Sequence, residues 1–290
     1  MLITLINVIS SSLIMGGLYA IIAMGLSIQY GVARILNVSH GEFIMVGAFL
    51  TLGLFKLNVN PLLAMVIIAP LMFVVGFVVH RTIYKKLSDV SGSSAAFESN
   101  SMLVSFGLMF VIQNFALQTW GSQQQSYSFL LSPVKLLGTA IALNRLVVLV
   151  LAVAISLLFY LFLMKSRLGK SIRAVSQDPA SAARVGIKVH RIGAICFGIG
   201  TVLAGCAGSL LSITNQFNSS IGMGYTIIAI IVVVLGGMGS VPGSLLGGFI
   251  LGFVGTVVNY IDPSLSLVAY YVIIIVLLLV KPSGLMGGKS

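Results

Sequence analysis

The sequence predicts an all-α membrane protein whose chain crosses the bilayer several times. Of its 290 residues, 58% are hydrophobic and only 7% are charged, and the mean hydropathy is +1.14. A soluble domain carries about 25% charged residues. Apolar runs recur along the whole chain and are separated by short links that hold most of the charges. We therefore expect a single transmembrane domain over residues 1–290, with no room for a soluble domain.

The apolar runs predict eight or nine membrane helices. A bilayer core about 30 Å thick requires around 20 apolar residues per helix, and several runs are shorter than this. The first run has no basic segment before it and continues into further spans, so we expect a retained helix rather than a removed signal peptide. The runs cover residues 5–30, 42–57, 61–80, 100–120, 146–164, 192–214, 225–238, 244–261 and 265–280.

The distribution of Lys and Arg predicts the topology. Twelve of the sixteen basic residues fall in three links, and basic links remain in the cytoplasm. The net charge of +11 therefore reflects membrane topology and not a nucleic-acid groove. We expect a multi-pass protein of the cytoplasmic membrane with its C-terminus inside and, by parity, its N-terminus outside. The basic links are 81–86, 165–191 and 281–289, and the outer links are 56–60, 121–145 and 262–264.

Two polar, glycine-punctuated interruptions, at 31–42 and 236–243, break the apolar pattern. Corresponding interruptions indicate an internally duplicated transporter whose broken helices line a path. Irregular backbone at membrane depth survives only against protein or water. The residues assigned to a path or its gate are Asn37, Ser39, His40, Glu42, Gly236, Gly239 and Ser240. A purely structural role for them stays open, including an ion pair between Arg34 and Glu42.

Catalytic, metal and nucleotide sites are not expected. The adjacent Ser39 and His40 point to different sides of a helix, and a single His-Gly-Glu lacks the histidine pair of a zinc helix. Segments 166–171 and 285–290 both end in Gly-Lys-Ser, but Met164 and Ser283 occupy the position where a P-loop requires glycine. We expect no cofactor in this chain, so that any ATP is bound by a partner.

The basic segment 165–191 is expected to be a structured cytoplasmic loop. Residues 168–176 can form a short amphipathic helix. A second helix over 180–185 has Asp178 as N-cap, Pro179 as first residue and Gly186 as its stop. Such a capped helix with small side chains can insert into a cleft on another protein. An amphipathic loop on anionic headgroups is the alternative.

Residues Asp178, Ala182, Ala183 and Gly186 resemble the coupling segment of ABC importer permeases. Together with three further stretches they resemble the permease subunits of branched-chain amino acid importers of the LivH type, over essentially the whole chain. Ser39 stands where that family usually has alanine before His-Gly. The three stretches are Gly16–Ala20 leading into Gly31–Glu42, then Gln177–Arg191, and Val234–Gly248.

The resemblance implies an assembly that works by alternating access. A second, homologous permease would complete the membrane pore, two cytoplasmic ATPases would dock on the coupling loops, and an extracytoplasmic binding protein would deliver the substrate. The chain itself would not be an enzyme. A related importer of urea, amides or sugars remains open. An ATP-independent secondary transporter is disfavoured, because only five acidic residues are present and four lie in or beside links.

Overall fold

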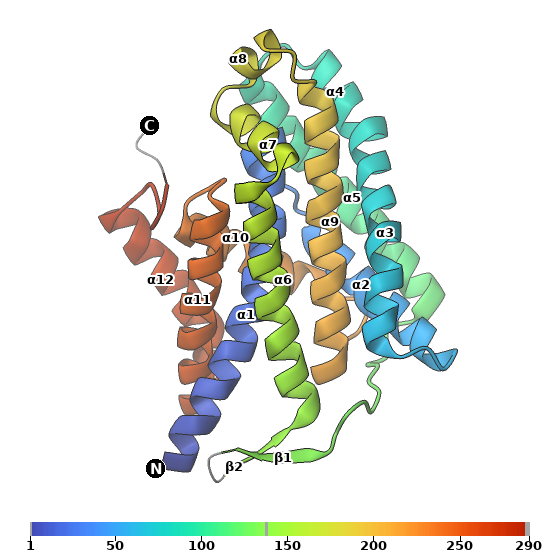
Figure 1. The fold of residues 1–290 in the computed structure, drawn as a ribbon, viewed down its shortest axis with the longest axis vertical. Coiled ribbons are helices and arrows are strands. Elements are labelled where there is room, and N and C mark those ends of the chain that lie inside the picture. The colour runs from blue at the N-terminus through green and yellow to red at the C-terminus, as the bar shows by residue number, and fades with distance from the viewer. Residues whose placement is uncertain (1, 137–138, 288–290) are drawn as a thin grey trace.

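The computed structural model describes residues 2–136 and 139–287, and the chain over these residues is almost entirely helical (Figure 1). Residues 1, 137–138 and 288–290 lie outside this part, including Lys289 and the end of the Gly-Lys-Ser segment at 285–290. The elements are α1 (Leu2–Ala33), α2 (His40–Lys56), α3 (Pro61–Val79), the π-helix η1 (His80–Tyr84), α4 (Lys85–Val90), α5 (Ser94–Trp120), β1 (Pro133–Leu136), β2 (Thr139–Ala142), α6 (Leu143–Lys165), α7 (Arg167–Gln177), α8 (Pro179–Arg184), α9 (Val189–Thr214), α10 (Gly222–Gly236), α11 (Val241–Ile261), the 3₁₀ turn η2 (Pro263–Leu265) and α12 (Ser266–Val280).

The prediction of an all-α polytopic membrane protein is confirmed. Seven helical segments within the described residues are long and apolar enough to cross a bilayer. The runs at 42–57 and 225–238 also form helices, α2 and α10, but these have only 17 and 15 residues. Their shortness is a property of the fold, because each begins midway along the bundle.

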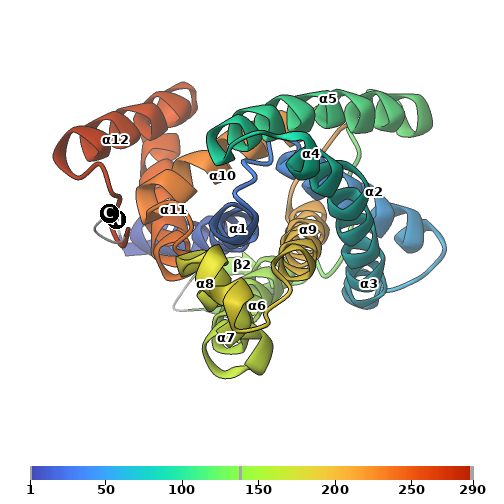
Figure 2. The ribbon, with the colours of Figure 1, turned by 90° about the horizontal axis from the view of Figure 1, so that it is seen from above.

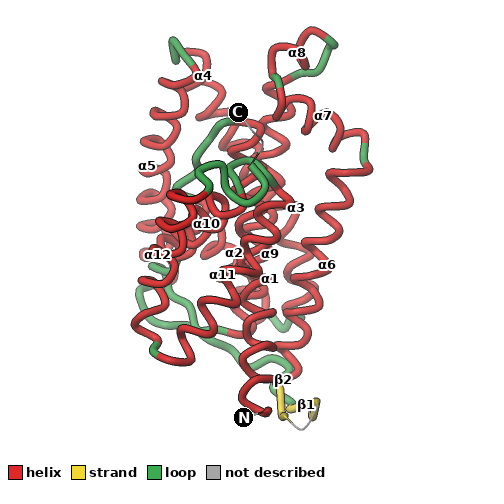
Figure 3. The backbone as a smooth tube through the Cα atoms, turned by 90° about the vertical axis from the view of Figure 1, so that its left-hand side faces the viewer, coloured by secondary structure: helices red, strands yellow, loops and turns green. Residues whose placement is uncertain are grey.

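The two ends of the bundle carry different elements (Figures 1 and 3). The start of α1 lies beside the β1–β2 hairpin, whereas α4, α7 and α8 lie at the opposite end. We call these the outer and the inner end. The hairpin pairs Pro133 with Ala142 and Leu136 with Thr139, so the loop at 121–145 has local structure. The first helix begins on the side of this loop, in agreement with the parity of the predicted spans.

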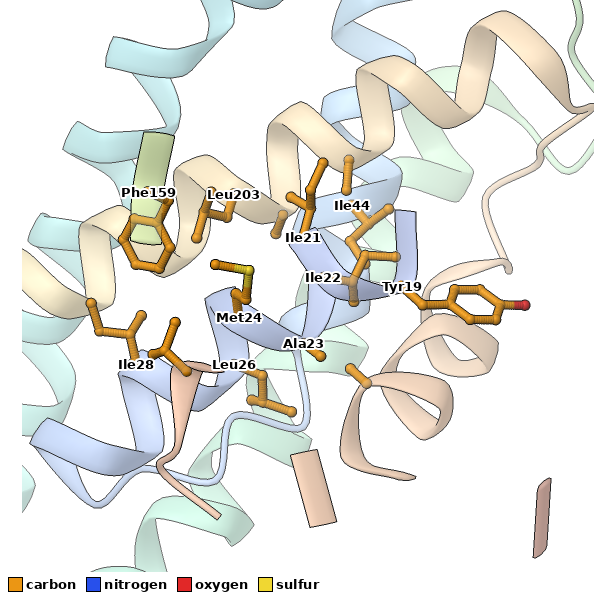
Figure 4. Packing of buried hydrophobic residues seen from close by; sticks show 14 of the residues in the cluster. Tyr19, Ile21, Ile22, Ala23, Met24, Leu26, Ile28, Ile44, Phe159 and Leu203 are labelled. Carbon is orange, nitrogen blue, oxygen red and sulfur yellow. The ribbon is translucent and has the colours of Figure 1, made fainter. Parts of the chain in front are cut away.

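Helices α1 and α9 form the centre of the bundle and the other helices surround them (Figure 2). Ile21, Ile22 and Met24 of α1 have no exposed surface and pack among side chains of α2, α6 and α9 (Figure 4). The helices at the periphery of the bundle instead expose large apolar residues: Leu103 of α5 is 74% exposed and Leu279 of α12 is 81% exposed. A lipid-facing surface explains this inversion, because lipid tails are as apolar as these side chains.

Glycines bring α1 and α11 into close contact. A Cβ atom on Gly248 would overlap the backbone of Ala20, and one on Gly252 would overlap the backbone of Gly16. The glycines of α11 that are spaced by four residues therefore allow two helices of this chain to pack closely. The α1–α11 contact is the most extensive between any two helices of the described chain.

The helices are arranged as an inverted repeat. The first central helix, α1, runs from the outer to the inner end, and α9 runs in the reverse direction (Figure 1). Each is followed by a break, a shorter helix and a longer helix: α2 and α3 in the first unit, α10 and α11 in the second. Across the units, α1 packs on α11 and α9 packs on α3. The fold thus supports the predicted internal repeat.

The pairing of interruptions predicted from the sequence is wrong. The counterpart of the break at 34–39 is the break at 215–221, since each separates a central helix from its short successor. The segment at 237–240 corresponds instead to the turn at 57–60, which joins the short helix to the next one. The high glycine content of 236–243 suggests a match with the break after α1, but the order of the helices shows that the break at 215–221 is the match.

The α1–α11 contact predicts a selective intolerance of added volume. Replacing Gly252 by alanine should destabilise the protein by about 1–3 kcal/mol, because the methyl group overlaps the Gly16 backbone. Gly53→Ala in α2 is the matched control, since no atom lies within 4 Å of its Cβ position. Thermal unfolding in detergent should give a lower melting temperature for Gly252→Ala only. Equal melting temperatures for the two variants would contradict this packing.

Candidate functional site

The short helices α2 and α10 begin at the same place, beside Ile22 in the inner half of α1. The ring Nε2 of His40 lies 3.0 Å from the carbonyl oxygen of Ile22, which is about 16 Å from the inner end of α1 at 1.5 Å per residue. From there α2 continues to the outer end, whereas α10 continues to the inner end, where Gly239 lies against Gly31. We call the meeting point of their N-termini the junction.

Two glycines allow the junction to close. A Cβ atom on Gly41 would overlap the carbonyl oxygen of Gly222, so the two helix starts are in direct backbone contact. The Oγ1 of Thr226 in α10 accepts from the Gly41 amide at 2.8 Å and donates to the Val38 carbonyl at 3.0 Å. The Thr226 hydroxyl therefore links the break before α2 to the N-terminal part of α10.

The predicted residues Asn37, Ser39 and His40 form hydrogen bonds at the first break. Asn37 Oδ1 accepts from the amide of Ser39 at 3.1 Å and from its hydroxyl at 2.6 Å. The amide group of Asn37 donates to Gln29 Oε1 of α1 at 3.1 Å. With His40 bound to Ile22, the break is anchored to α1 on both sides.

A short repeated motif marks the two breaks. Asn37, Ser39 and Gly41 have the same spacing as Asn218, Ser220 and Gly222. The second copy repeats the turn, since the Ser220 amide donates to Asn218 Oδ1 at 3.0 Å. Asparagine side chains stabilise such turns by mimicking a backbone carbonyl. This Asn-x-Ser-x-Gly pair is the signal in the sequence that would have matched the two breaks correctly.

Glu42 is a fully buried carboxyl group at the junction. Neither of its oxygens has a hydrogen-bond partner within the described residues. The expected ion pair with Arg34 does not form: Arg34 is exposed and its guanidinium lies 5.8 Å from the centre of the Tyr30 ring. Arg34 has a left-handed backbone, with φ of 53°, at the chain reversal after α1. This reversal carries Glu42 back into the bundle and leaves Arg34 at its inner end.

Two helix N-termini face the Glu42 carboxyl group. Glu42 belongs to the first turn of α2, and a Cβ atom on Gly222, the first residue of α10, would overlap the carboxyl oxygens. The N-terminus of a helix carries a partial positive charge, which favours an acidic group nearby. Ionisable groups at membrane depth are rare and are usually functional. The junction thus combines a buried acid with two converging helix dipoles.

The second predicted set, Gly236, Gly239 and Ser240, lies elsewhere. These residues form the inner-end turn between α10 and α11, where Ser240 Oγ accepts from the Gly243 amide at 3.2 Å and caps α11. Gly239 has φ of 81°, a left-handed value that favours glycine. The seven residues assigned to a path or its gate therefore fall into two groups. Four lie at the junction and three lie at the inner-end turn, and the length of α10 separates the two groups.

The loop at 165–191 folds as its residues suggest. Asp178 Oδ1 accepts from the Ala180 amide at 2.9 Å, and hydrogen bonds from Ser181 hold the pKa of this carboxyl group below its ordinary value. The helix α8 ends before Gly186, which has φ of 87°. Ala182 is buried against the bundle, so that Ala183 is the exposed member of the pair.

Val185 is a residue of this loop that sequence reasoning missed. Its side chain is 77% exposed and places an apolar group on the face of the loop that points away from the bundle. The preceding helix α7 is anchored to the bundle, because Ile172 and Val175 are buried in the main core. A partner that touches Ala183 and Val185 would therefore meet a loop supported by α7 and, through it, by α1, α6 and α9.

Cavities lie on both sides of the junction. Two outer cavities, of about 400 and 580 Å³, share Ser11, Ile14, Arg145 and Thr214 as lining residues. An inner cavity of about 330 Å³ contains basic and imidazole side chains from η1, α4, α9 and the break after α1. Within the described chain, no group of three or more His, Cys, Asp and Glu residues could hold a metal ion. Arg145, in particular, was not identified as a site residue from the sequence.

The junction predicts a dependence on the sign of the charge at position 42. Glu42→Lys should lower the melting temperature more than Glu42→Met, because a cation would face two positive helix ends while methionine adds similar volume without charge. Asp89→Lys, at an exposed position, controls for the charge change itself. The measurement is thermal unfolding of the purified variants, and equal stability of the two Glu42 variants would refute the dipole argument.

Comparison with known proteins gives the family. The family model described as "branched-chain amino acid transport system / permease component" matches residues 8–280. The chain is 29% identical to the high-affinity branched-chain amino acid transport permease BraD of Pseudomonas aeruginosa, over 96% of this chain and 94% of that protein. It is 27% identical to the corresponding permease LivH of Escherichia coli, over 94% and 92% respectively. The Escherichia coli ribose import permease RbsC is 30% identical over 43% of this chain and 40% of its own length. No solved structure matches significantly. The chain belongs to the family of permease components of branched-chain amino acid transport systems.

Proposed function

We propose that this chain is a permease subunit of an ATP-driven importer that moves branched-chain amino acids across the cytoplasmic membrane. The observation that carries the proposal is the similarity to BraD and LivH over more than nine-tenths of both chains. The presence of seven apolar spans and a junction inside the bundle is consistent with a transport path rather than with catalysis. The protein works by positioning and moving helices, without a reaction of its own.

ATP is bound by partner subunits in this proposal. The Gly-Lys-Ser segment at 166–171 starts α7, and its Ser166 hydroxyl accepts from the Gly169 amide to cap that helix. The segment therefore serves as a helix start and lacks the first glycine of a P-loop. Two cytoplasmic ATPases dock at the inner end on α8, a second homologous permease completes the pore, and a binding protein delivers substrate to the outer end. The inner end and the C-terminus face the cytoplasm.

Movement of α8 is transmitted through α7. When an ATPase docks on Ala183 and Val185, it pushes α8. Helix α8 contacts α7, which packs on α1, α6 and α9. The two central helices carry the breaks, so a shift of α7 alters the junction and opens the cavities on one side or the other. A differential of a few kcal/mol between the inward-open and outward-open states is enough to reverse their populations.

A sugar importer is the second candidate, because RbsC matches part of the chain. The test is uptake of radiolabelled leucine and ribose by cells that express the chain together with the second permease, the ATPases and the binding protein of its importer. ATP-dependent uptake of leucine supports the proposal. Uptake of ribose alone, or leucine uptake that persists without the ATPases, contradicts it.

The docking role of α8 predicts a separation of folding from coupling. Ala183→Arg should abolish leucine uptake and reduce co-purification of the ATPases, because a long cation on the exposed face prevents close docking. The melting temperature should stay unchanged, since Ala183 is exposed. Ala95→Arg places the same group on an exposed alanine of α5 at the same end and should leave uptake intact. Normal uptake and normal ATPase binding by Ala183→Arg would show that α8 is not the docking helix.

A further inference from the structure

The outer cavities contain one charged side chain, Arg145, among all their described lining residues. Arg145 is the third residue of α6 and lines both cavities. It makes no hydrogen bond or ion pair with the part of the chain that the structure describes. An exposed guanidinium at the mouth of a cavity is suited to a carboxylate, which it can bind through two parallel hydrogen bonds.

Amide groups that are not buried lie in the same space. Asn215 and Asn259 line the cavity of about 400 Å³ together with Arg145, and neither side chain is buried. The side-chain oxygen of an asparagine can accept a hydrogen bond from an ammonium group.

Apolar and aromatic groups complete the lining. Ile14 and Met15 of α1 contribute apolar surface, while the hydroxyls of Tyr19 and Tyr270 lie 3.3 Å apart. The lining therefore combines apolar side chains with polar ones, and small-molecule sites have volumes of about 300 to 1,000 Å³. The outer cavities fall in this range at about 400 and 580 Å³.

The cavities also occupy the right position along the bundle. Their α1 residues, from Asn7 to Tyr19, lie on the outer side of Ile22 and hence of the junction. Helix α10 runs only from the junction to the inner end. The space between α1, α11 and α12 on the outer side of the junction therefore contains no helix of the described chain and holds the cavity of about 400 Å³. A solute that entered from the outer end would meet this space before it reached the junction.

We infer that the outer cavities form a binding site for a zwitterionic α-amino acid, in which Arg145 binds the carboxylate and the side-chain oxygens of Asn215 and Asn259 accept from the ammonium group. This inference rests on the proposed function and adds the substrate-binding residues to it. A neutral sugar or urea would leave the guanidinium without its counter-charge. Arg145 thus makes the permease itself, and not only a binding protein, selective for amino acids.

The experiment measures binding of tritiated leucine to the full purified chain in lipid nanodiscs by scintillation proximity. Leucinamide, which keeps the side chain and the ammonium group but lacks the carboxylate, serves as competitor. Wild-type protein should prefer leucine over leucinamide at least about tenfold. Arg145→Gln should weaken leucine binding about ten- to a hundredfold and remove that preference, whereas Arg145→Lys should retain part of both.

Lys56→Gln is the matched control, because it removes an exposed positive charge at the outer end of α2 that lines neither cavity. If Arg145→Gln binds leucine as tightly as Lys56→Gln does, or if the wild-type chain shows no saturable binding, the inferred site is wrong. Leucine uptake by the complete transporter separates the two claims. Uptake with failed binding overturns only the site, whereas absence of uptake overturns the proposed function.

Discussion

The fold depends on how the backbone is satisfied at two helix breaks inside a bilayer. Water is not available there to hydrogen-bond free amide and carbonyl groups, so each must find a partner in the protein. At the first break the second unit supplies partners, because Thr226 of α10 bonds both Val38 and Gly41. The contact of Gly41 with Gly222 brings α10 close enough for this one hydroxyl to reach both groups.

Several features follow from this junction. Two helices that start at mid-depth and leave in opposite directions each fill half of the membrane, and cavities occupy space on either side. Two positive helix ends meet, which explains how Glu42 can be buried without an ion pair among the described residues. Helix α7 packs on both α1 and α9, the two helices that precede the breaks. Under the proposed function, the transport path, its gate and the ATPase docking loop therefore share one structural unit.

Much of this architecture could be predicted from the sequence. Hydropathy predicted the apolar helices, and Asp178, Pro179 and Gly186 predicted α8, since caps and stops are local signals. The pairing of the breaks has a signal in the sequence, the repeated Asn-x-Ser-x-Gly spacing, but the glycine content of 236–243 is more conspicuous. Two features could not be predicted, because they depend on contacts between distant segments. The isolation of Glu42 follows from the left-handed turn at Arg34. The role proposed for Arg145 depends on a cavity assembled from α1, α6, α9, α11 and α12.

The most direct test of the account is the stability of Thr226 variants. Thr226→Val keeps the shape of the side chain but leaves the Val38 carbonyl and the Gly41 amide without partners, which should cost about 1–3 kcal/mol. Thr226→Ser keeps the hydroxyl and should remain close to wild type. Thermal unfolding of the purified chain in nanodiscs should therefore rank valine clearly below serine. A valine variant as stable as wild type would show that the junction does not depend on this hydroxyl, and the central claim would fail.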